Sequence, residues 1–252
     1  MKALPSSEWH HRFLQQARWT SELRQFIIKQ CGLSPNQPLL EVGCGTGAIL
    51  SEFSTWKGSL VAGLDLRLDF LKEAQKPFSK SLIQGNAYAL PIKSGSFAAV
   101  FCHFLFLWLH DPLPVLKEMV RVAKPGGYII AFAEPDYGGR IDHPQPLVEL
   151  GRLQGDALRT QGADPCIGRK LSGLFHQVGL VDVQTGILGG QWGGPPSAEA
   201  WDSEWTTLEN DLAGVVSSEE LYGLRLLDEA AWEKGERILF VPTFYAWGKV
   251  PA

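Results

Sequence analysis

The segment LLEVGCGTGAIL at residues 39–50 constrains the fold of this chain more than any other. An apolar run that ends at Val42 is typical of a short buried strand. It leads into three glycines at alternate positions, Gly43, Gly45 and Gly47. Glycine tolerates the sharp bends of such a turn and leaves no Cβ in the way of a ligand. The apolar residues that follow predict a helix, reaching Trp56, whose free N–H groups point at the bound molecule.

Two carboxylates accompany this turn. Glu41 immediately precedes it, and a carboxylate there suits an amine or hydroxyl and opposes a pyrophosphate, which a helix N-terminus otherwise binds. The G-x-G-x-G spacing also differs from the G-x-G-x-x-G pattern of dinucleotide sites. A second apolar run, residues 60–64, ends in Asp65. Ligands of doubly wound sheets lie outside the carboxyl ends of strands, so we expect Asp65 to accept both hydroxyls of a ribose.

Together these residues resemble the class I S-adenosylmethionine-dependent methyltransferases. Residues 41–47 match that family's first motif at every position, and Asp65 matches its ribose acid. Residues 85–87 are similar to its adenine-contacting segment, and residues 120–127 to its turn before the fifth strand. The resemblance is close over residues 35–135. It implies S-adenosyl-L-methionine as cofactor and a small-molecule acceptor, as in the type 11 group. The cofactor-binding residues it implies are Glu41, Gly43, Cys44, Gly45, Gly47, Asp65, Leu66, Asn86, Ala87 and His103.

The pattern along the chain predicts an α/β fold, doubly wound and Rossmann-like. Strands are expected at 38–42, 60–64, 81–84, 97–102, 128–133, 180–188 and 238–250, and helices at 8–31, 67–76, 112–123, 144–162 and 169–178. Pro77 is expected to end the second of these helices, and Pro242 to mark an edge or a bulge in the last strand. The resemblance implies a mostly parallel, seven-stranded sheet with an antiparallel last strand.

Three parts are expected. Residues 1–34 form an N-terminal lid helix, residues 35–188 and 236–252 form the cofactor-binding core, and residues 189–235 form a helical cap insertion. In the cap, Trp201 and Trp205 are four residues apart on one helix face, where they line an acceptor pocket or anchor the insertion. In the lid helix, an arginine such as Arg12 or Arg18 either meets the methionine carboxylate or belongs to a solvated face.

Composition narrows the class of partner. The formal net charge is −4 and the chain has no lysine- or arginine-rich block, which disfavours nucleic acid and anionic membranes. No apolar run reaches 18 residues, and the N-terminus lacks an apolar signal core. The four cysteines are scattered without metal-ligand spacing, so we expect no disulfide framework, no metal site and a cytoplasmic location. The sequence favours no particular oligomeric state.

Methyl transfer from a sulfonium donor chiefly demands positioning and exclusion of water, with a base where the acceptor must lose a proton. His103 follows the fourth strand and is expected to contact the donor or act as that base, unless it is a satisfied core histidine. As a base it predicts a loss of rate below about pH 6.5. Glu134 and Asp136 are expected to orient the acceptor, or else to cap the loop that follows the fifth strand. Tyr137 and His143 of the same loop are expected acceptor contacts, and Arg140 pairs with Asp136 or Asp142.

The function predicted is methyl transfer to an enclosed small molecule. An NAD-linked oxidoreductase of related fold is one alternative, which the glycine spacing and Glu41 oppose. A non-catalytic module that binds the donor or a partner is another. The density of polar residues from Glu134 to His143 opposes that second alternative.

Overall fold

The computed structural model describes residues 5–53, 56, 60–76, 81–189 and 194–252. A seven-stranded sheet with the order β3-β2-β1-β4-β5-β9-β7 forms its centre. The strands are β1 (Leu39–Val42), β2 (Val61–Asp65), β3 (Leu82–Gln84), β4 (Phe97–Cys102), β5 (Ala123–Pro135), β7 (Val181–Leu188) and β9 (Thr243–Lys249). Strand β9 runs antiparallel to both β5 and β7, and the other neighbouring pairs in this sheet are parallel. The predicted doubly wound sheet with an antiparallel last strand is confirmed.

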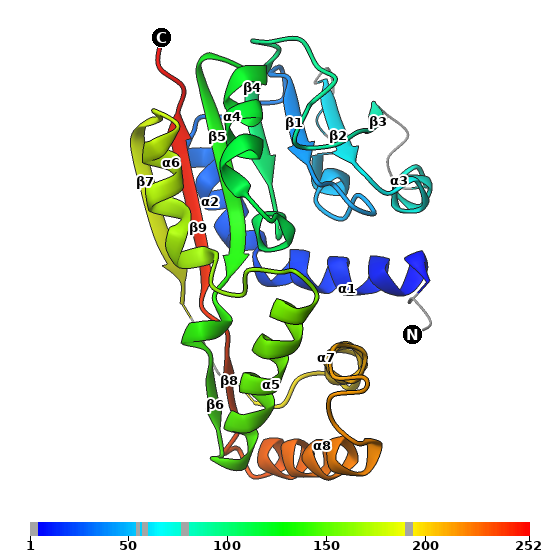
Figure 1. The fold of residues 1–252 in the computed structure, drawn as a ribbon. Coiled ribbons are helices and arrows are strands. Elements are labelled where there is room, and N and C mark those ends of the chain that lie inside the picture. The colour runs from blue at the N-terminus through cyan, green and yellow to red at the C-terminus, as the bar shows by residue number, and fades with distance from the viewer. Residues whose placement is uncertain (1–4, 54–55, 57–59, 77–80, 190–193) are drawn as a thin grey trace.

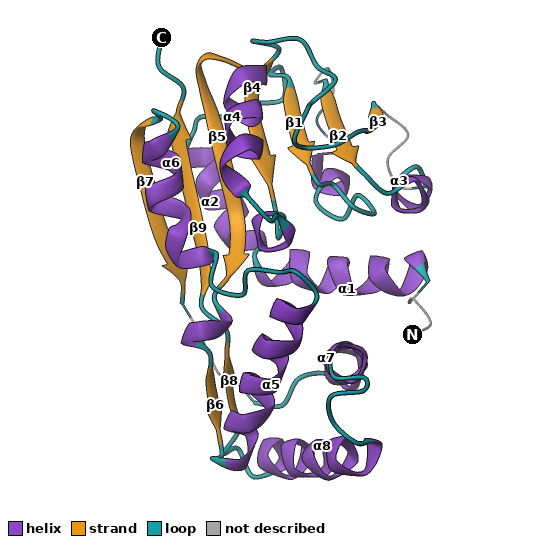
Figure 2. Ribbon diagram, in the orientation of Figure 1, coloured by secondary structure: helices purple, strands orange, loops and turns teal. Residues whose placement is uncertain are grey.

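Helices cover both faces of the sheet, as Figure 2 shows. One face carries α2 (Ser21–Gln30), and the other carries α4 (Pro112–Val122) and α6 (Leu171–Gln177). Because both faces are covered, β1 is buried at every residue, which explains its three apolar residues and leaves Glu41 as a buried carboxyl group among them. On α4 the apolar residues at helical spacing all point inward, and Asp111 caps the helix by accepting from the Leu113 N–H at 3.1 Å.

The first two helices differ from the prediction. The single helix expected over 8–31 is two, α1 (Ser6–Trp19) and α2, which meet at Thr20. Thr20 has φ −109° and ψ 8°, outside the helical region, and its hydroxyl lies 3.2 Å from the Gln16 carbonyl. Such side-chain bonds to the backbone compete with helix continuation. The helix expected after the glycine turn is also shorter, a 3₁₀ turn η1 (Leu50–Phe53), and α3 covers Leu68–Ala74.

The predicted last strand is interrupted at Pro242, which has no N–H to donate. It divides into β8 (Ile238–Phe240) and β9. Strand β8 leaves the main sheet and pairs with β6 (Ile141–His143) in a separate two-stranded sheet. Pro242 therefore marks the point where the chain passes from one sheet to the other.

The two helices within the predicted insertion pack against a helix outside it. Helices α7 (Ala198–Asp211) and α8 (Ser218–Glu233) share one hydrophobic cluster with α5 (Pro146–Thr160), which lies outside residues 189–235. The buried members are Leu147, Leu150, Ala157, Trp205, Leu208, Leu212 and Leu221. We call α5, α7, α8, β6 and β8 the cap. Residues 190–193, where the insertion was expected to begin, and Pro77 lie outside the described residues.

Figure 1 shows the cap beyond the carboxyl ends of the parallel strands, with α1 crossing between the two. Ligands of open α/β sheets bind at those strand ends, so this arrangement encloses the region where a site is expected. Among the helices in the described ranges, none is long and apolar enough to cross a membrane.

Candidate functional site

The glycine turn after β1 has the backbone conformation that its sequence predicts. Gly43, Gly45 and Gly47 have φ values of +74°, +51° and +77°. A Cβ on Gly43 would lie 2.7 Å from Leu105 Cδ1, and one on Gly45 would lie 3.1 Å from the Phe13 ring. The positive φ values disfavour larger residues here, and a Cβ would also require Leu105 and Phe13 to shift.

Asp65 lies at the end of β2 beside this turn. Its Oδ2 accepts the Gly45 N–H and its Oδ1 accepts the Arg67 N–H, both at 2.8 Å. Burial raises the pKa of the carboxyl. Asp65 thus holds the turn while it stands at the expected ribose position, a structural role that the sequence did not indicate.

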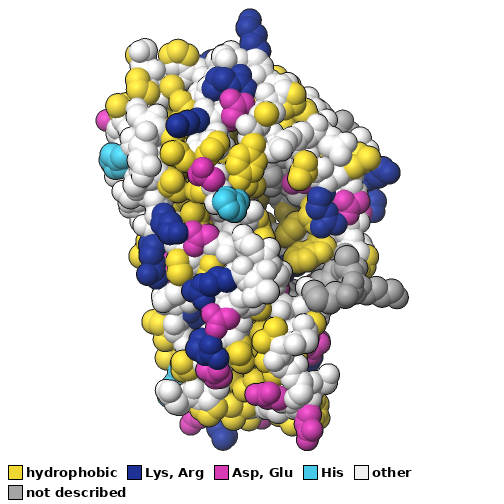
Figure 3. Space-filling model, viewed as in Figure 1, with side chains coloured by type: hydrophobic (Ala, Val, Ile, Leu, Met, Phe, Trp, Pro, Cys, Tyr) yellow, Lys and Arg dark blue, Asp and Glu magenta, His cyan; other side chains and the backbone are white. Residues whose placement is uncertain are grey.

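The other predicted cofactor contacts gather at the same ends of β1, β2 and β3. Cys44 is buried, and its N–H donates to the Leu64 carbonyl at 3.0 Å. Leu66 is 65% exposed just after Asp65. Beyond β3, Ala87 is half-buried and Asn86 is exposed, its Oδ1 accepting the Tyr88 N–H at 3.0 Å. Figure 3 shows a hollow bordered by hydrophobic side chains between these strand ends and α1.

Glu41 carries an unsatisfied oxygen beside the turn. The residue is 2% exposed, and its Oε2 has no hydrogen-bond partner. Burial raises the pKa of the carboxyl well above its ordinary value, against the opposing effect of Arg24. Because buried polar atoms are nearly always paired in native proteins, this oxygen suits a donor group brought by a ligand.

His103 belongs to a buried hydrogen-bond network that the sequence did not predict. Its Nε2 lies 2.9 Å from Thr20 Oγ1. The fully buried Arg24 donates to that hydroxyl, and it also bonds to the Ala17 carbonyl at 2.7 Å and pairs with Glu52. Burial and then the Arg24 charge lower the pKa of His103 well below its ordinary value. The imidazole is therefore neutral at pH 7, and any acid limit that it imposes lies below the expected pH 6.5.

Glu134 does not face an open acceptor space. Its Oε1 accepts the N–H groups of Leu105 and Phe106, both at 2.9 Å, and its Oε2 accepts that of Leu107 at 3.1 Å. The side chain is fully buried, and burial raises its pKa to about 7. The expectation that this carboxylate orients the acceptor needs correction, because both of its oxygens hold the loop after β4, which includes η2 (Phe106–Trp108).

The other polar residues after β5 differ in burial and in their partners. Asp136 is 2% exposed, pairs with Arg169 and accepts the Gly139 N–H at 3.1 Å, so it is committed to the loop. Tyr137 is half-buried against the core, and burial raises the pKa of its hydroxyl to about 12. His143 is exposed on β6 in the cap, and its expected contact with the acceptor stays a prediction.

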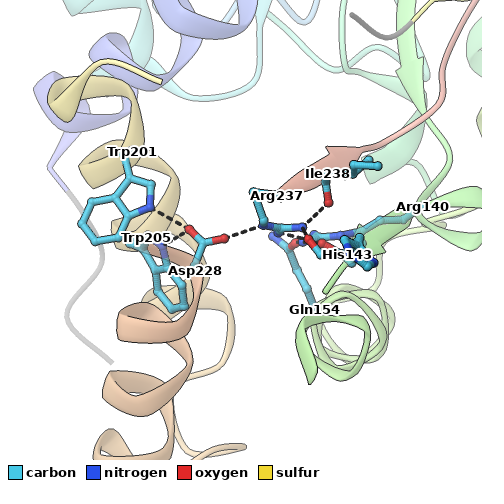
Figure 4. Close-up of polar contacts among 9 residues, drawn as sticks. Arg140, His143, Gln154, Trp201, Trp205, Asp228, Arg237 and Ile238 are labelled. Carbon is cyan, nitrogen blue, oxygen red and sulfur yellow. Dashed lines mark hydrogen bonds and ion pairs between the residues drawn. The ribbon is translucent and has the colours of Figure 1, made fainter. Parts of the chain in front are cut away.

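The two tryptophans of α7 anchor the cap. Their indole N–H groups both donate to Asp228 Oδ2, Trp201 at 2.7 Å and Trp205 at 3.0 Å. Asp228 also pairs with Arg237 at 2.5 Å, as Figure 4 shows. Trp205 is only 1% exposed, so we assign it to anchoring α7 against α8 and not to lining an acceptor pocket.

The same network continues into the two-stranded sheet. Arg237 Nη2 pairs with Asp142 at 2.7 Å, and Asp142 pairs with Arg140 at 2.6 Å, one of the two partners expected for that arginine. Arg140 also donates to Gln154 of α5, so α5, α8, β6 and β8 are joined by polar contacts (Figure 4).

Helix α1 lies against the glycine turn. The Phe13 ring packs at Gly45, and His10 Nδ1 lies 2.9 Å from Thr46 Oγ1. On its other side, Arg12 pairs with Glu204 of α7 at 2.7 Å. Arg12 is thus neither solvated nor at the donor site, and no local pattern in the sequence links it to a residue 192 positions away. Among the described residues, no group of three or more His, Cys, Asp or Glu is placed to hold a metal ion.

Comparison with known proteins gives one consistent family. A family model described as a methyltransferase domain matches residues 40–131. The chain is 38% identical over 187 residues to the demethylmenaquinone methyltransferase of Shouchella clausii, covering 64% of this chain and 77% of that protein. It is 34% identical over 127 residues to that of Renibacterium salmoninarum, covering 49% of this chain and 52% of that protein. The chain thus spans about half the length of some curated relatives and three quarters of others.

Solved structures agree on the fold. A methyltransferase from Bacillus halodurans has a TM-score of 0.62 at 15% identity, covering 92% of this chain and 99% of that one. Phosphoethanolamine N-methyltransferase 2 of Haemonchus contortus, in complex with S-adenosyl-L-methionine, has a TM-score of 0.59 at 15% identity. It covers 92% of this chain and 53% of that one.

Proposed function

We propose that this chain, which belongs to the class I S-adenosylmethionine-dependent methyltransferase family, transfers the methyl group of S-adenosylmethionine to a small molecule enclosed between the sheet and the cap. One observation carries the proposal most directly. The glycine turn, Asp65 and the unpaired Glu41 oxygen converge at the carboxyl ends of β1 and β2, where ligands of this fold class bind. The relatives described above are methyltransferases, which favours this activity over the NAD-linked alternative.

The residues fit the donor as follows. The turn at residues 43–47 would hold the methionine part, because its glycines leave the backbone open to close approach. Asp65 would accept the ribose hydroxyls, and Glu41 would accept an N–H or O–H of the donor. Leu66, Asn86 and Ala87 would border the adenine.

The chemistry places modest demands on the protein. The bound sulfonium supplies an activated methyl group, so the chain's own residues need only bind, orient and exclude water. Helix α1 and the cap supply the enclosure. His103 is neutral at pH 7 and can therefore receive a proton, although its Nε2 already engages Thr20.

For the acceptor we extend to this chain the class that its relatives' names give, a demethylmenaquinone-type ring in its reduced form. The donor's methyl group is electrophilic, so the ring must be electron-rich, as a quinol is. A ring carbon then bonds to the methyl group as the sulfur–methyl bond breaks, and the ring loses a proton to a base. We also propose a cytoplasmic location and no nucleic-acid partner, from the free cysteines and the net charge of −4.

The experiment has two stages. Thermal unfolding is followed with S-adenosylmethionine, S-adenosylhomocysteine and NAD, and the first two are expected to raise the melting temperature while NAD does not. Transfer of a radiolabelled methyl group is then followed into reduced demethylmenaquinone and a metabolite panel. Stabilisation by NAD alone would contradict the family reading of the site. Donor binding without transfer to any acceptor would favour the non-catalytic module.

A further inference from the structure

Helix α1 contacts the glycine turn on one face and α7 on the opposite face. One face meets the donor site through Phe13, which packs at Gly45, and His10, which reaches Thr46. The opposite face, with residues at helical spacing that include Arg12 and Gln15, looks toward α7. Any displacement of α1 relative to α7 therefore also moves the wall of the donor site.

Polar contacts join α1 to α7 across a gap. A cavity of about 290 Å³ lies between these helices, lined on the α1 side by residues such as Glu8 and His11 and on the α7 side by Ser203 and Thr207. Arg12 Nη2 pairs with Glu204 Oε2 at 2.7 Å, and Gln15 Nε2 donates to the Ala200 carbonyl at 3.2 Å.

The ion pair is buried and incompletely satisfied. The side chains of Arg12 and Glu204 are 9% and 21% exposed, and Arg12 Nε has no hydrogen-bond partner. Burial raises the pKa of Glu204, but Arg12, Arg140 and Arg237 together hold it below its ordinary value, so the carboxylate is ionised. A buried pair of this kind holds firmly while both partners are present, and the loss of one leaves an uncompensated charge. The unpaired Nε–H of Arg12 offsets part of the stabilisation that the pair provides.

Resting on the proposed function, we propose that Arg12 and Glu204 are positioning residues that tie α1 to the cap and thereby control exchange of S-adenosylmethionine and its demethylated product at the glycine turn. The tie acts through α1, and neither residue contacts the reacting atoms. Opening of the cap to admit or release the acceptor is coupled in this way to the donor site.

The test measures S-adenosylhomocysteine association and dissociation rates by surface plasmon resonance. Glu204→Gln keeps the size of the side chain and removes its charge, and we expect product dissociation to become about tenfold faster. Arg12→Lys keeps the charge but loses the guanidinium contacts with Gln15 and Trp19, so its dissociation rate should lie between those of the wild type and Glu204→Gln. Gln15→Ala should give a smaller change in the same direction. Glu209→Gln, which removes an exposed partner of Arg225 on the same helix α7, is the matched control and should leave the rates unchanged.

Hydrogen exchange supplies a second reading that needs no ligand. In the free protein, Glu204→Gln should speed amide exchange in α1 while β1 and β4 keep their protection, because only the tie is lost. Equal acceleration in α1, β1 and β4 would mean general destabilisation and would overturn the proposal. So would dissociation within about twofold of the wild type together with unchanged exchange in α1. A wild type that binds no S-adenosylhomocysteine would contradict the proposed function, and α1 exchange would still decide whether the tie exists.

Discussion

At the scale of single residues, Asp65 has two roles: it is the proposed ribose ligand, and it accepts two backbone hydrogen bonds that hold the glycine turn. Asp65→Asn replaces one accepting oxygen by an NH₂ group, which must then face the N–H of Gly45 or Arg67. We expect a loss of about 1.5–3 kcal/mol in donor binding, or one to two decades in affinity. Calorimetric titration with S-adenosylhomocysteine measures it. Asp69→Asn, on an exposed carboxylate that pairs with Arg67, is the control, and an unchanged dissociation constant for Asp65→Asn would remove Asp65 from the site.

His103 makes a prediction about pH because its pKa is lowered in the folded protein. Between that lowered pKa and the ordinary 6.5, the unfolded chain binds a proton that the folded chain does not. Stability is therefore lost as the pH falls below 6.5, by at most about 2 kcal/mol by pH 5. Urea unfolding at several pH values should show a smaller loss for His103→Gln than for the wild type. Equal losses would mean that His103 is not buried in its neutral form.

Residue positions were predictable where the backbone dictates them. Gly43, Gly45 and Gly47 need positive φ, and Asp65 follows a buried strand, so their identities and spacing already indicate a ligand turn. Arg24 was not predictable, because it lies in a helix whose pattern does not distinguish a buried arginine from a solvated one. Its burial depends on Glu52, which is distant in the sequence and is placed by the fold.

At the scale of elements, Glu134 connects β5 to the loop after β4. Glu134→Gln keeps one accepting oxygen and sets an NH₂ group against an N–H that Glu134 now accepts, such as that of Leu107. We expect about 1–3 kcal/mol lower stability. Leu105 lies against Gly43, so weaker donor binding should accompany this loss. Thermal unfolding and S-adenosylhomocysteine titration measure the two effects, and a variant that keeps both stability and donor affinity would contradict the loop-holding role.

Elements followed the sequence wherever local chemistry decides them. Strand β4 has the predicted bounds because six apolar residues fill a sheet covered on both faces. The separate β8 was missed because it depends on pairing with β6 across the fold. The break at Thr20 was missed because the hydroxyl that bonds locally to the Gln16 carbonyl is also held by His103, which is distant in the sequence. The same is true of α5, whose apolar face gives no sign that its partners are α7 and α8.

At the scale of the whole molecule, most buried apolar residues of the cap form a hydrophobic cluster of their own, while Leu158 of α5 packs in a cluster of the sheet. The cluster of the cap includes Leu147 and Leu150 of α5, so deleting only residues 189–235 would uncover them and expose apolar surface. That deletion is therefore expected to give an aggregation-prone chain, and a point substitution inside the cap separates the two parts more cleanly.

Asp228→Asn is that substitution. It keeps the volume of the side chain but removes the negative charge. In the wild type, the Asp228 carboxylate pairs with Arg237 and accepts the indole N–H groups of Trp201 and Trp205. Arg237 would keep only Asp142 as an ion-pair partner, which it shares with Arg140, so we expect a loss smaller than about 3–5 kcal/mol, the cost of a fully uncompensated buried charge, and we expect it to fall on the cap. Amide exchange should quicken in α7, α8 and α5, while β1, β4 and the glycine turn keep their protection, because the sheet's core lies in other clusters. If β1 and β4 lose protection together with α8, the cap and the sheet unfold as one unit, and acceptor enclosure cannot be varied without disturbing the donor site.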